Sequence, residues 1–254
     1  MELELITGES ENFLCDRYKV TNLSSQDELL VSYKRLADEA PDYAFLVTLD
    51  NLGQACYTSM HAKMAHNLDD TDGHDLSSLS AVCFKDGEHK GCLTSKEEFF
   101  IRKSNFLKRC SDISIDDVFK KEIELYEESI DDFIEANNNI LSIMDERVFI
   151  LKVPVENSYE TLFAFPNGYF SCDLNPFETY LLSKHMQQEF GYRLMGIGAS
   201  YIAFIRTRKA SEVQIDQLTE FISKIYSDDV DSDIASALKS LIRDQKILVL
   251  RYIE

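Results

Sequence analysis

The chain has 254 residues, of which 44% are hydrophobic, and carries a formal net charge of −19 at pH 7. No apolar run approaches the roughly 20 residues that cross a bilayer, and the acidic first residues lack the basic and apolar segments of a secretory signal. Six cysteines are scattered without a CxxC pair, as in a reduced, cytosolic protein. Such an acidic chain disfavours nucleic acid and membrane surfaces and favours basic protein partners. We therefore expect a cytoplasmic protein.

The negative charge is concentrated in one half of the chain. Residues 1–146 carry 14 Lys and Arg against 31 Asp and Glu, whereas residues 147–254 carry 12 against 14. Together with a change in sequence texture at the same point, this shift predicts two domains. They are an acidic N-terminal domain at 1–146 and a C-terminal domain at 147–254.

Strand and helix signals follow one another irregularly through the first 110 residues. Ser25 and Glu28 form a capping box before an apolar-periodic segment that ends at Pro41, which predicts a helix. The polar stretch 67–80 predicts a surface loop. The other predicted elements of this part are strands at 2–6, 12–20, 43–49 and 79–84 and a helix at 95–109.

The longest periodic segment lies near residues 114–144. Its apolar-face positions are spaced alternately by four and three residues, and they are Phe119, Ile123, Tyr126, Ile130, Phe133, Asn137, Ile140 and Met144. This spacing predicts one long helix with an apolar seam and an intensely acidic opposite face. The seam packs either on its own domain or against a second copy. The acidic face is the candidate partner-binding surface, with Glu124, Glu127, Glu128, Asp131, Asp132 and Glu135 as its residues.

The C-terminal half also mixes both kinds of element. Strands are predicted at 147–155, 161–165, 192–198, 200–207 and 246–253, and helices at 177–190, 211–226 and 232–243. Because strands and helices do not alternate strictly, we predict an α+β fold with mixed or antiparallel sheets packed with helices.

A histidine-rich stretch is the first candidate for chemistry. Four histidines (His61, His66, His74 and His89) share it with several aspartates. Two histidines five residues apart diverge on a helix and do not form an HExxH motif. In a calcium-loop alignment, Leu68 and Leu79 would occupy ligand positions that require oxygen. We therefore predict no metal site here, although an enzyme of unrecognised type with a site near His61–His89 stays an alternative.

Known catalytic and cofactor motifs are missing elsewhere. The chain has no GxSxG, no phosphate-binding loop and no third glycine after the Gly196–Gly198 pair. Cys172 and His185 are 13 residues apart and form a candidate dyad. We predict no catalytic residue and no cofactor.

The order of motifs in the second half points to a family. These motifs are Val153–Glu156, Asn167–Cys172, Phe190–Leu194, Met195–Gly198 and Tyr226–Val230, followed by a helix and a strand. Residues 147–254 thereby resemble a bacterial family, the domain of unknown function 4253. The resemblance implies a compact α+β interaction domain without established catalytic residues. Some similar small domains serve as immunity proteins against secreted toxins.

Three functional hypotheses follow from these patterns. The first is a non-enzymatic, cytoplasmic immunity protein that binds and neutralises a cognate, basic toxin, since charge complementarity would speed their association. The second is a regulatory or structural adaptor that dimerises through the 119–144 seam. The third is the enzyme with a site near His61–His89.

Overall fold

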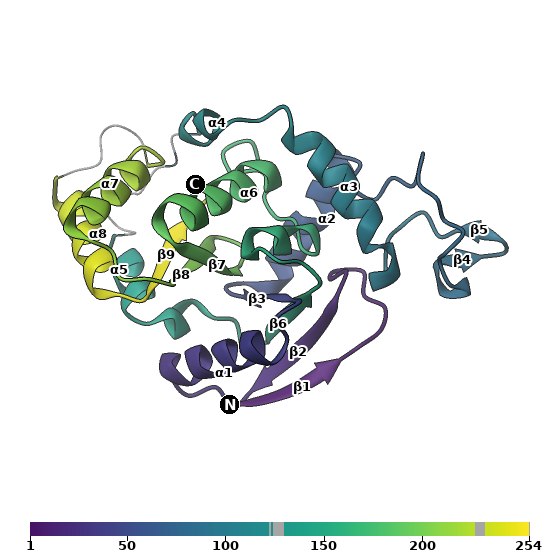
Figure 1. The fold of residues 1–254 in the computed structure, drawn as a ribbon, viewed down its shortest axis with the longest axis horizontal. Coiled ribbons are helices and arrows are strands. Elements are labelled where there is room, and N and C mark those ends of the chain that lie inside the picture. Colours follow the sequence, from purple (N-terminus) through teal and green to yellow (C-terminus); the bar gives the residue numbers. More distant parts are fainter. Residues whose placement is uncertain (122, 124–129, 227–231, 254) are drawn as a thin grey trace.

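The computed structural model describes residues 1–121, 123, 130–226 and 232–253. At its centre lies a seven-stranded sheet with the order β1-β2-β6-β3-β7-β8-β9 (Figure 1). Neighbouring strands are antiparallel, except that β3 and β7 are parallel. The strands are β1 (Glu2–Ile6), β2 (Asp16–Thr21), β3 (Ala44–Thr48), β6 (Val148–Val153), β7 (Tyr192–Ile197), β8 (Tyr201–Arg206) and β9 (Ile247–Arg251). This mixed sheet, packed with helices, confirms the predicted α+β class.

Helices cover both faces of the sheet. One face packs against α1 and part of α5, and the other packs against α2, α3, α6 and α7. The helices are α1 (Gln26–Glu39), α2 (Leu52–Ala65), α3 (Phe99–Cys110), α4 (Ile115–Phe119), α5 (Ile130–Asn138), α6 (Pro176–His185), α7 (Glu212–Ser223) and α8 (Ser232–Asp244). Short helical turns lie at η1 (Ala81–Cys83), η2 (Lys96–Glu98), η4 (Ile140–Ile143), η5 (Ser158–Phe163) and η6 (Met186–Phe190).

The central strand β3 explains the two helical layers. All five of its residues are buried. Ala44 and Leu46 join the core beneath α2, α3 and α6, while Phe45 and Val47 join the core beneath α1. Successive side chains of a strand point to opposite faces. A continuous apolar strand therefore needs a helical cover on each side.

The predicted boundary near residue 146 falls within this sheet. β6 belongs to the segment 147–254, but it lies between β2 and β3 and pairs antiparallel with both. β3 in turn pairs with β7 on its other edge. The segments 1–146 and 147–254 thus contribute neighbouring strands to one sheet.

The prediction of one continuous helix near 114–144 is wrong. α4 ends at Phe119, and the described part of α5 runs from Ile130 to Asn138. Between them, Ile123 is not helical and its backbone N–H donates to the carbonyl of Ile225 at 3.1 Å. The apolar spacing continues across this break because each short piece buries its own apolar residues against the same body. Tyr126 of the predicted seam lies outside the described residues.

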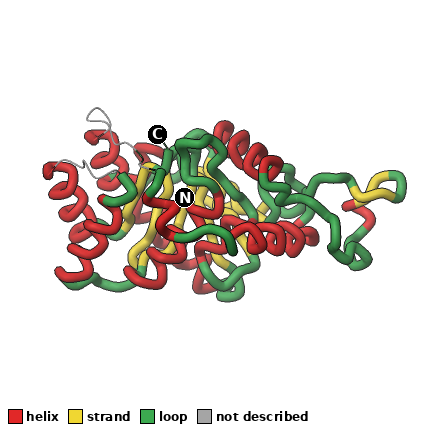
Figure 2. Tube along the Cα trace, turned by 90° about the horizontal axis from the view of Figure 1, so that it is seen from above, coloured by secondary structure: helices red, strands yellow, loops and turns green. Residues whose placement is uncertain are grey.

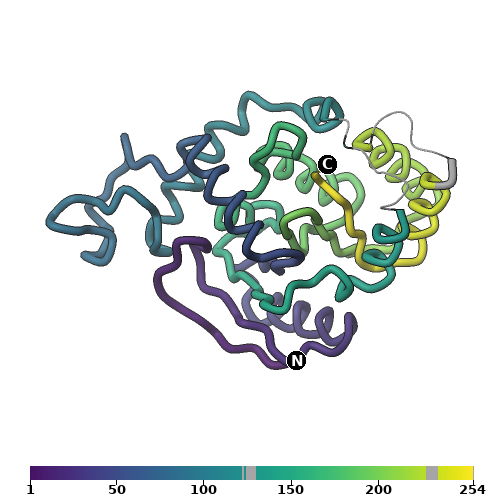
Figure 3. The backbone as a smooth tube through the Cα atoms, turned by 180° about the vertical axis from the view of Figure 1, so that it is seen from behind, coloured from purple at the N-terminus to yellow at the C-terminus, as the bar shows by residue number. Residues whose placement is uncertain are grey.

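An arm formed by residues 66–98 extends from the body of the molecule (Figures 1, 2 and 3). Its tip holds the short hairpin of β4 (Phe84–Lys85) and β5 (Glu88–His89). The predicted surface loop at 67–80 belongs to this arm. Within the described ranges, no helix is long and apolar enough to cross a membrane.

Candidate functional site: a groove along helix α2

Helix α2 turns its large apolar side chains toward solvent. Tyr57, Met60 and Met64 are 47%, 42% and 67% exposed, whereas the buried side of the helix contains small residues such as Ala55 and Ala62. A helix on a globular protein normally buries its large apolar residues and exposes polar ones. The reversed arrangement on α2 marks its outer face as a candidate binding surface.

The start of α2 is fixed directly after β3. Asn51 caps the helix with a left-handed φ of 37°, and its side chain accepts the N–H of Gln54 at 3.1 Å. Asparagine tolerates this backbone region better than most residues. The N–H of Leu52 donates to the carboxylate of Asp145 at 2.9 Å. These contacts set the position from which α2 leaves the sheet.

The outer face of α2 forms one wall of a groove with a cavity volume of about 810 Å³, called the α2 groove below. The opposite wall consists of residues 11–12, from the β1–β2 connection, and residues 91–94 of the arm. The helical residues that line the groove run from Gly53 to Met64, which is roughly 17 Å at the helical rise per residue. The groove is therefore long enough for about three turns of a partner helix.

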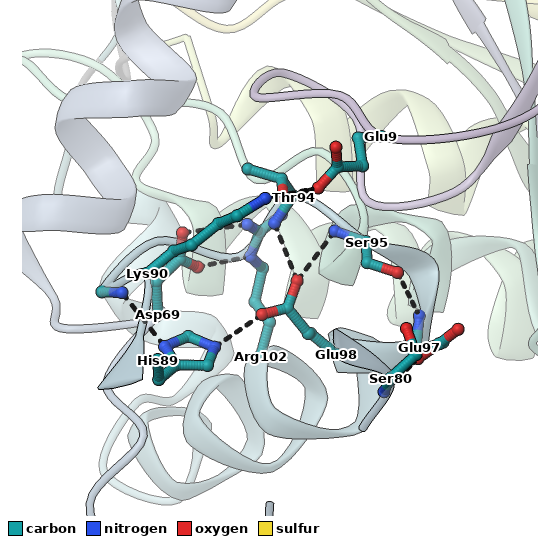
Figure 4. Close-up of polar contacts among 11 residues, drawn as sticks. Glu9, Asp69, Ser80, His89, Lys90, Thr94, Ser95, Glu97, Glu98 and Arg102 are labelled. Atoms are coloured by element: carbon teal, nitrogen blue, oxygen red, sulfur yellow. Dashed lines mark hydrogen bonds and ion pairs between the residues drawn. The ribbon is translucent and has the colours of Figure 1, made fainter. Parts of the chain in front are cut away.

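A buried carboxylate holds the arm side of the groove in place. Glu98 is fully buried, and its side chain accepts the N–H groups of Thr94 and Ser95 at 2.9 and 2.8 Å (Figure 4). Nε2 of His89 lies 2.7 Å from the same carboxylate. Nδ1 of His89 accepts the N–H of Gly91 at 3.1 Å, so the proton lies on Nε2, which donates to Glu98. One carboxylate thus ties together the two ends of the groove wall.

The two loops that face α2 are also joined to each other. Lys90 donates to the carboxylate of Glu9 at 2.8 Å, and the Thr94 hydroxyl donates to the same oxygen at 3.1 Å (Figure 4). The hydrogen bond from Lys90 holds the pKa of Glu9 below its ordinary value. The N–H of Ser10 donates to the carbonyl of Thr94 at 2.8 Å. The wall opposite α2 is therefore one connected unit.

Two buried cations lie in this region, of which Lys63 lines the groove and Arg102 does not. Lys63 is 7% exposed, and its Nζ donates to the carbonyl of Glu11 at 3.0 Å. Arg102 donates to both carboxylate oxygens of Asp69 at 2.6 and 3.0 Å and to the carbonyl of Ala164 at 3.3 Å. Burial, and then the charge of Arg102, lower the pKa of Lys63 to about 8. Arg102 is neutralised by its bidentate partner, but Lys63 has no carboxylate of its own.

A row of aromatic rings continues the exposed surface beyond the α2 groove. The centroid of the Tyr57 ring lies 4.3 Å from that of His61, which lies 4.8 Å from Tyr169. Tyr169 is in turn 5.4 Å from Phe170, and both of these side chains are exposed. The apolar surface therefore spans α2 and the loop before α6.

The loop that carries the last two rings is anchored to α2. The buried side chain of Asn167 accepts a hydrogen bond from the Thr58 hydroxyl of α2 and donates to the carbonyl of Gly198 at 3.0 Å. Gly168 follows with a φ of 99°, and a Cβ there would lie 1.9 Å from the carbonyl oxygen of Leu174. Only glycine fits this position. The exposed rings are thus presented by a fixed loop.

The predicted partner-binding residues lie elsewhere on the molecule. Asp131, Asp132 and Glu135 are exposed on α5, which lies beside β9 at the left of Figure 1, whereas α2 lies toward the right. The other three, Glu124, Glu127 and Glu128, lie outside the described residues.

The described positions of the predicted seam face the protein's own core. Ile123, Phe133 and Ile140 are buried. The buried side chain of Asn137 donates to the carbonyl of Val249 at 2.9 Å and accepts its N–H at 2.8 Å. This pair of hydrogen bonds covers the outer edge of β9. These residues are therefore not available as a contact with a second copy.

The histidines and the candidate dyad do not assemble into one site. His66 packs on Phe177, whereas His74 bonds the Asn105 side chain at 3.0 Å. His185 stacks on Phe221, with 4.5 Å between ring centroids. Across the described part of the chain, no group of three or more His, Cys, Asp and Glu side chains could hold a metal ion.

The α2 groove was not predicted from the sequence, although Tyr57, Met60 and Met64 have the spacing of one helical face. That spacing indicates a helix face but does not tell whether the face is buried or exposed. No family model, curated protein or solved structure matches the chain.

Proposed function

We propose that this chain is a non-enzymatic, cytoplasmic immunity protein that binds a basic toxin and neutralises it. The observation that carries the proposal is the reversed helix α2, which exposes Tyr57, Met60 and Met64 along the α2 groove. Tyrosine, methionine and phenylalanine are enriched in the cores of protein interfaces. The flexible thioether side chains adapt to an irregular partner surface.

The negative charge of the chain favours a basic partner. The net charge is −19, and Asp70, Asp72 and Asp75 are exposed where α2 meets the arm. A hydrogen bond from the N–H of Ser77 holds the pKa of Asp75 below its ordinary value, so this carboxylate is charged at neutral pH. A partner that carries Lys and Arg around an apolar ridge complements both features.

The shape of the α2 groove favours an amphipathic helix as the docking element. Such a helix lays its apolar face into a groove and keeps its charged face outside. The exposed carboxylates of Asp131, Asp132 and Glu135 on α5 act in this proposal as a second acidic surface that attracts the partner from a distance. Glu124, Glu127 and Glu128, which lie outside the described residues, stay candidate partner-binding residues.

The proposal is tested first by capturing the partner. The tagged protein is used as bait in a lysate of its native host at low and high salt, and bound proteins are identified by mass spectrometry. We expect one stoichiometric basic protein that high salt weakens. The purified chain must then abolish that protein's toxic activity at a 1:1 ratio. A captured protein without toxicity, or toxicity that binding leaves intact, contradicts the immunity function.

Substitution of Tyr57 tests the α2 groove itself. Tyr57→Ala removes an exposed ring at the centre of the surface, and loss of an interface anchor costs about 2 kcal/mol, or roughly a 30-fold rise in Kd by calorimetry. Tyr43→Ala is the matched control, because Tyr43 is a partly exposed tyrosine at the opposite end of β3. Equal affinities of the two variants would show that the interface does not include the outer face of α2.

Charge reversal on α5 tests the second surface. Asp131→Lys and Asp132→Lys should slow association and reduce its salt dependence while leaving dissociation nearly unchanged. Stopped-flow kinetics separates the two rates. Unchanged association would remove α5 from the proposal without affecting the α2 groove.

A further inference from the structure

Lys63 is the one residue of the α2 groove that protein docking does not explain. Its side chain runs from α2 into the floor of the groove, and little of it is exposed. Its ammonium group can donate three hydrogen bonds. Within the described contacts it donates one, to the carbonyl of Glu11 at 3.0 Å. Among the described contacts, the two other N–H groups of Nζ have no partner.

The surroundings of Lys63 favour its neutral form. Burial is the main cause of its lowered pKa of about 8, and the Arg102 guanidinium on α3 adds to it. Asp69, Cys56 and Cys92 act in the opposite direction. Asp69 compensates only in part, because both of its carboxylate oxygens already accept hydrogen bonds from Arg102. About a quarter of Lys63 is then the free amine at pH 7.5, against about a thousandth for an ordinary lysine.

We propose that Lys63 is a nucleophilic lysine that binds small apolar aldehydes and ketones in the α2 groove as a reversible Schiff base. Nucleophilic lysines are activated by removal from water and by a neighbouring cation, and Lys63 has both. Met60, Met64 and Leu93 line the same groove and offer apolar contacts for the carbon chain. A cavity of about 810 Å³ is of the size that holds a small ligand.

The reaction needs only the carbonyl compound and one proton from solvent, and it releases one water molecule. The lone pair of the neutral Nζ attacks the carbonyl carbon, and the π electrons of the C=O bond move to its oxygen. Proton transfer from nitrogen to oxygen gives a carbinolamine, which loses one water molecule to form the C=N bond. The imine takes one proton from solvent through the open side of the groove. Its single N–H then donates to the Glu11 carbonyl, which already accepts from Nζ in the free protein.

Reductive trapping tests this inference. The full-length protein is treated with hexanal and sodium cyanoborohydride between pH 6 and 10, and peptide mass spectrometry follows the addition of a hexyl group at each lysine. At pH 7 we expect Lys63 to react at least ten times faster than exposed lysines such as Lys19 and Lys108. The rate at Lys63 should rise with pH and level off above pH 8.

Two variants separate nucleophilic from structural roles. Lys63→Arg retains a cation that can donate to Glu11 and should remove the fast-labelled position, with folding checked by circular dichroism. Lys108→Arg should leave the labelling of Lys63 unchanged, because Lys108 is exposed on α3 and does not line the groove. Labelling of Lys63 no faster than that of Lys19, or a pH profile shared with the exposed lysines, overturns the proposal. Either result can be read from the unsubstituted protein and leaves the toxin-binding function untouched.

Discussion

At the scale of single residues, the protein places the ammonium group of Lys63 in a largely desolvated position. Lys63 lies in the groove floor with one hydrogen bond and no carboxylate partner of its own. Desolvation of an ammonium group is costly unless the charge is paired. The side chain is therefore maintained against a free-energy cost, as is common at functional sites.

That cost predicts how stability changes with pH. The pKa of Lys63 is about 8 in the folded protein against an ordinary value of 10.5. Between these values the unfolded chain binds more protons, so the contribution of Lys63 to the free energy of unfolding rises with pH. Below pH 8 the destabilisation is fully present, and above pH 10.5 it is absent. The free energy of unfolding of Lys63→Met, taken relative to that of the unsubstituted protein, should therefore be roughly 2 kcal/mol higher at pH 7 than at pH 10.

Urea denaturation of both proteins at the two pH values measures this difference. Comparing the variant with the parent at each pH cancels the titration of all other groups that the two proteins share. A variant whose relative stability is the same at both pH values would show that Lys63 titrates normally.

At the scale of elements, α5 protects the open edge of the sheet. The Asn137 side chain both donates to and accepts from the backbone of Val249 in β9. An edge strand with free backbone groups is a template for aggregation. A helix side chain here takes the place of a neighbouring strand.

Substitution of Asn137 should expose this edge. Asn137→Ala leaves the N–H and carbonyl of Val249 buried without partners, which costs about 2 to 4 kcal/mol. We expect a lower urea midpoint and faster aggregation by light scattering. Asn138→Ala, an exposed neighbour on the same helix, should change stability by less than about 0.5 kcal/mol. Similar behaviour of the two variants would exclude the edge-covering role.

The sequence analysis was most successful for helix ends that depend only on residues close together in the chain. Ser25 caps α1 as predicted by accepting the N–H of Glu28, although the Glu28 side chain accepts from Ser24 and does not complete the capping box. The 161–165 segment, predicted as a strand, lies mainly in the helical turn η5, because its apolar residues pack in the core without pairing. The prediction of one long helix was wrong because apolar periodicity does not reveal a turn between two shorter pieces that each bury an apolar face.

The α2 groove depends on partners distant in sequence, and no local pattern contains them. Its walls come from α2, from residues 11–12 and from residues 91–94. The carboxylate that positions the arm side belongs to Glu98, which the sequence analysis did not single out as a site residue. In the structure it caps Ser95 and also accepts from His89. The charge of a residue can be read from sequence, but its burial and second partner cannot.

At the scale of the whole molecule, the interleaved sheet makes the two halves depend on each other. β6 has β2 and β3 as its only neighbours in the sheet, and both come from residues 1–146. A fragment of residues 147–254 would therefore expose both edges of a buried, apolar strand. The acidic segment 1–146 would lack the strand that joins β2 to β3.

We therefore expect neither fragment to fold alone. Circular dichroism and proton NMR of residues 1–146 and 147–254 should show poorly dispersed, unfolded chains. Mixing them at equal concentration should restore native-like spectra, because the missing strand pairs can then form. A fragment that is folded and unfolds cooperatively by itself would show that the division near residue 146 separates autonomous domains.

The place of β3 in the sheet also has a consequence for synthesis in the cell. Its two neighbours, β6 and β7, begin about 100 and about 150 residues later in the chain. At ribosomal speeds of about 5 to 20 residues per second, β3 waits roughly 5 to 20 seconds for its first partner. During that time a strand with four consecutive apolar residues is unprotected on the nascent chain. The heavy negative charge of the first 146 residues then keeps neighbouring nascent chains apart by mutual repulsion.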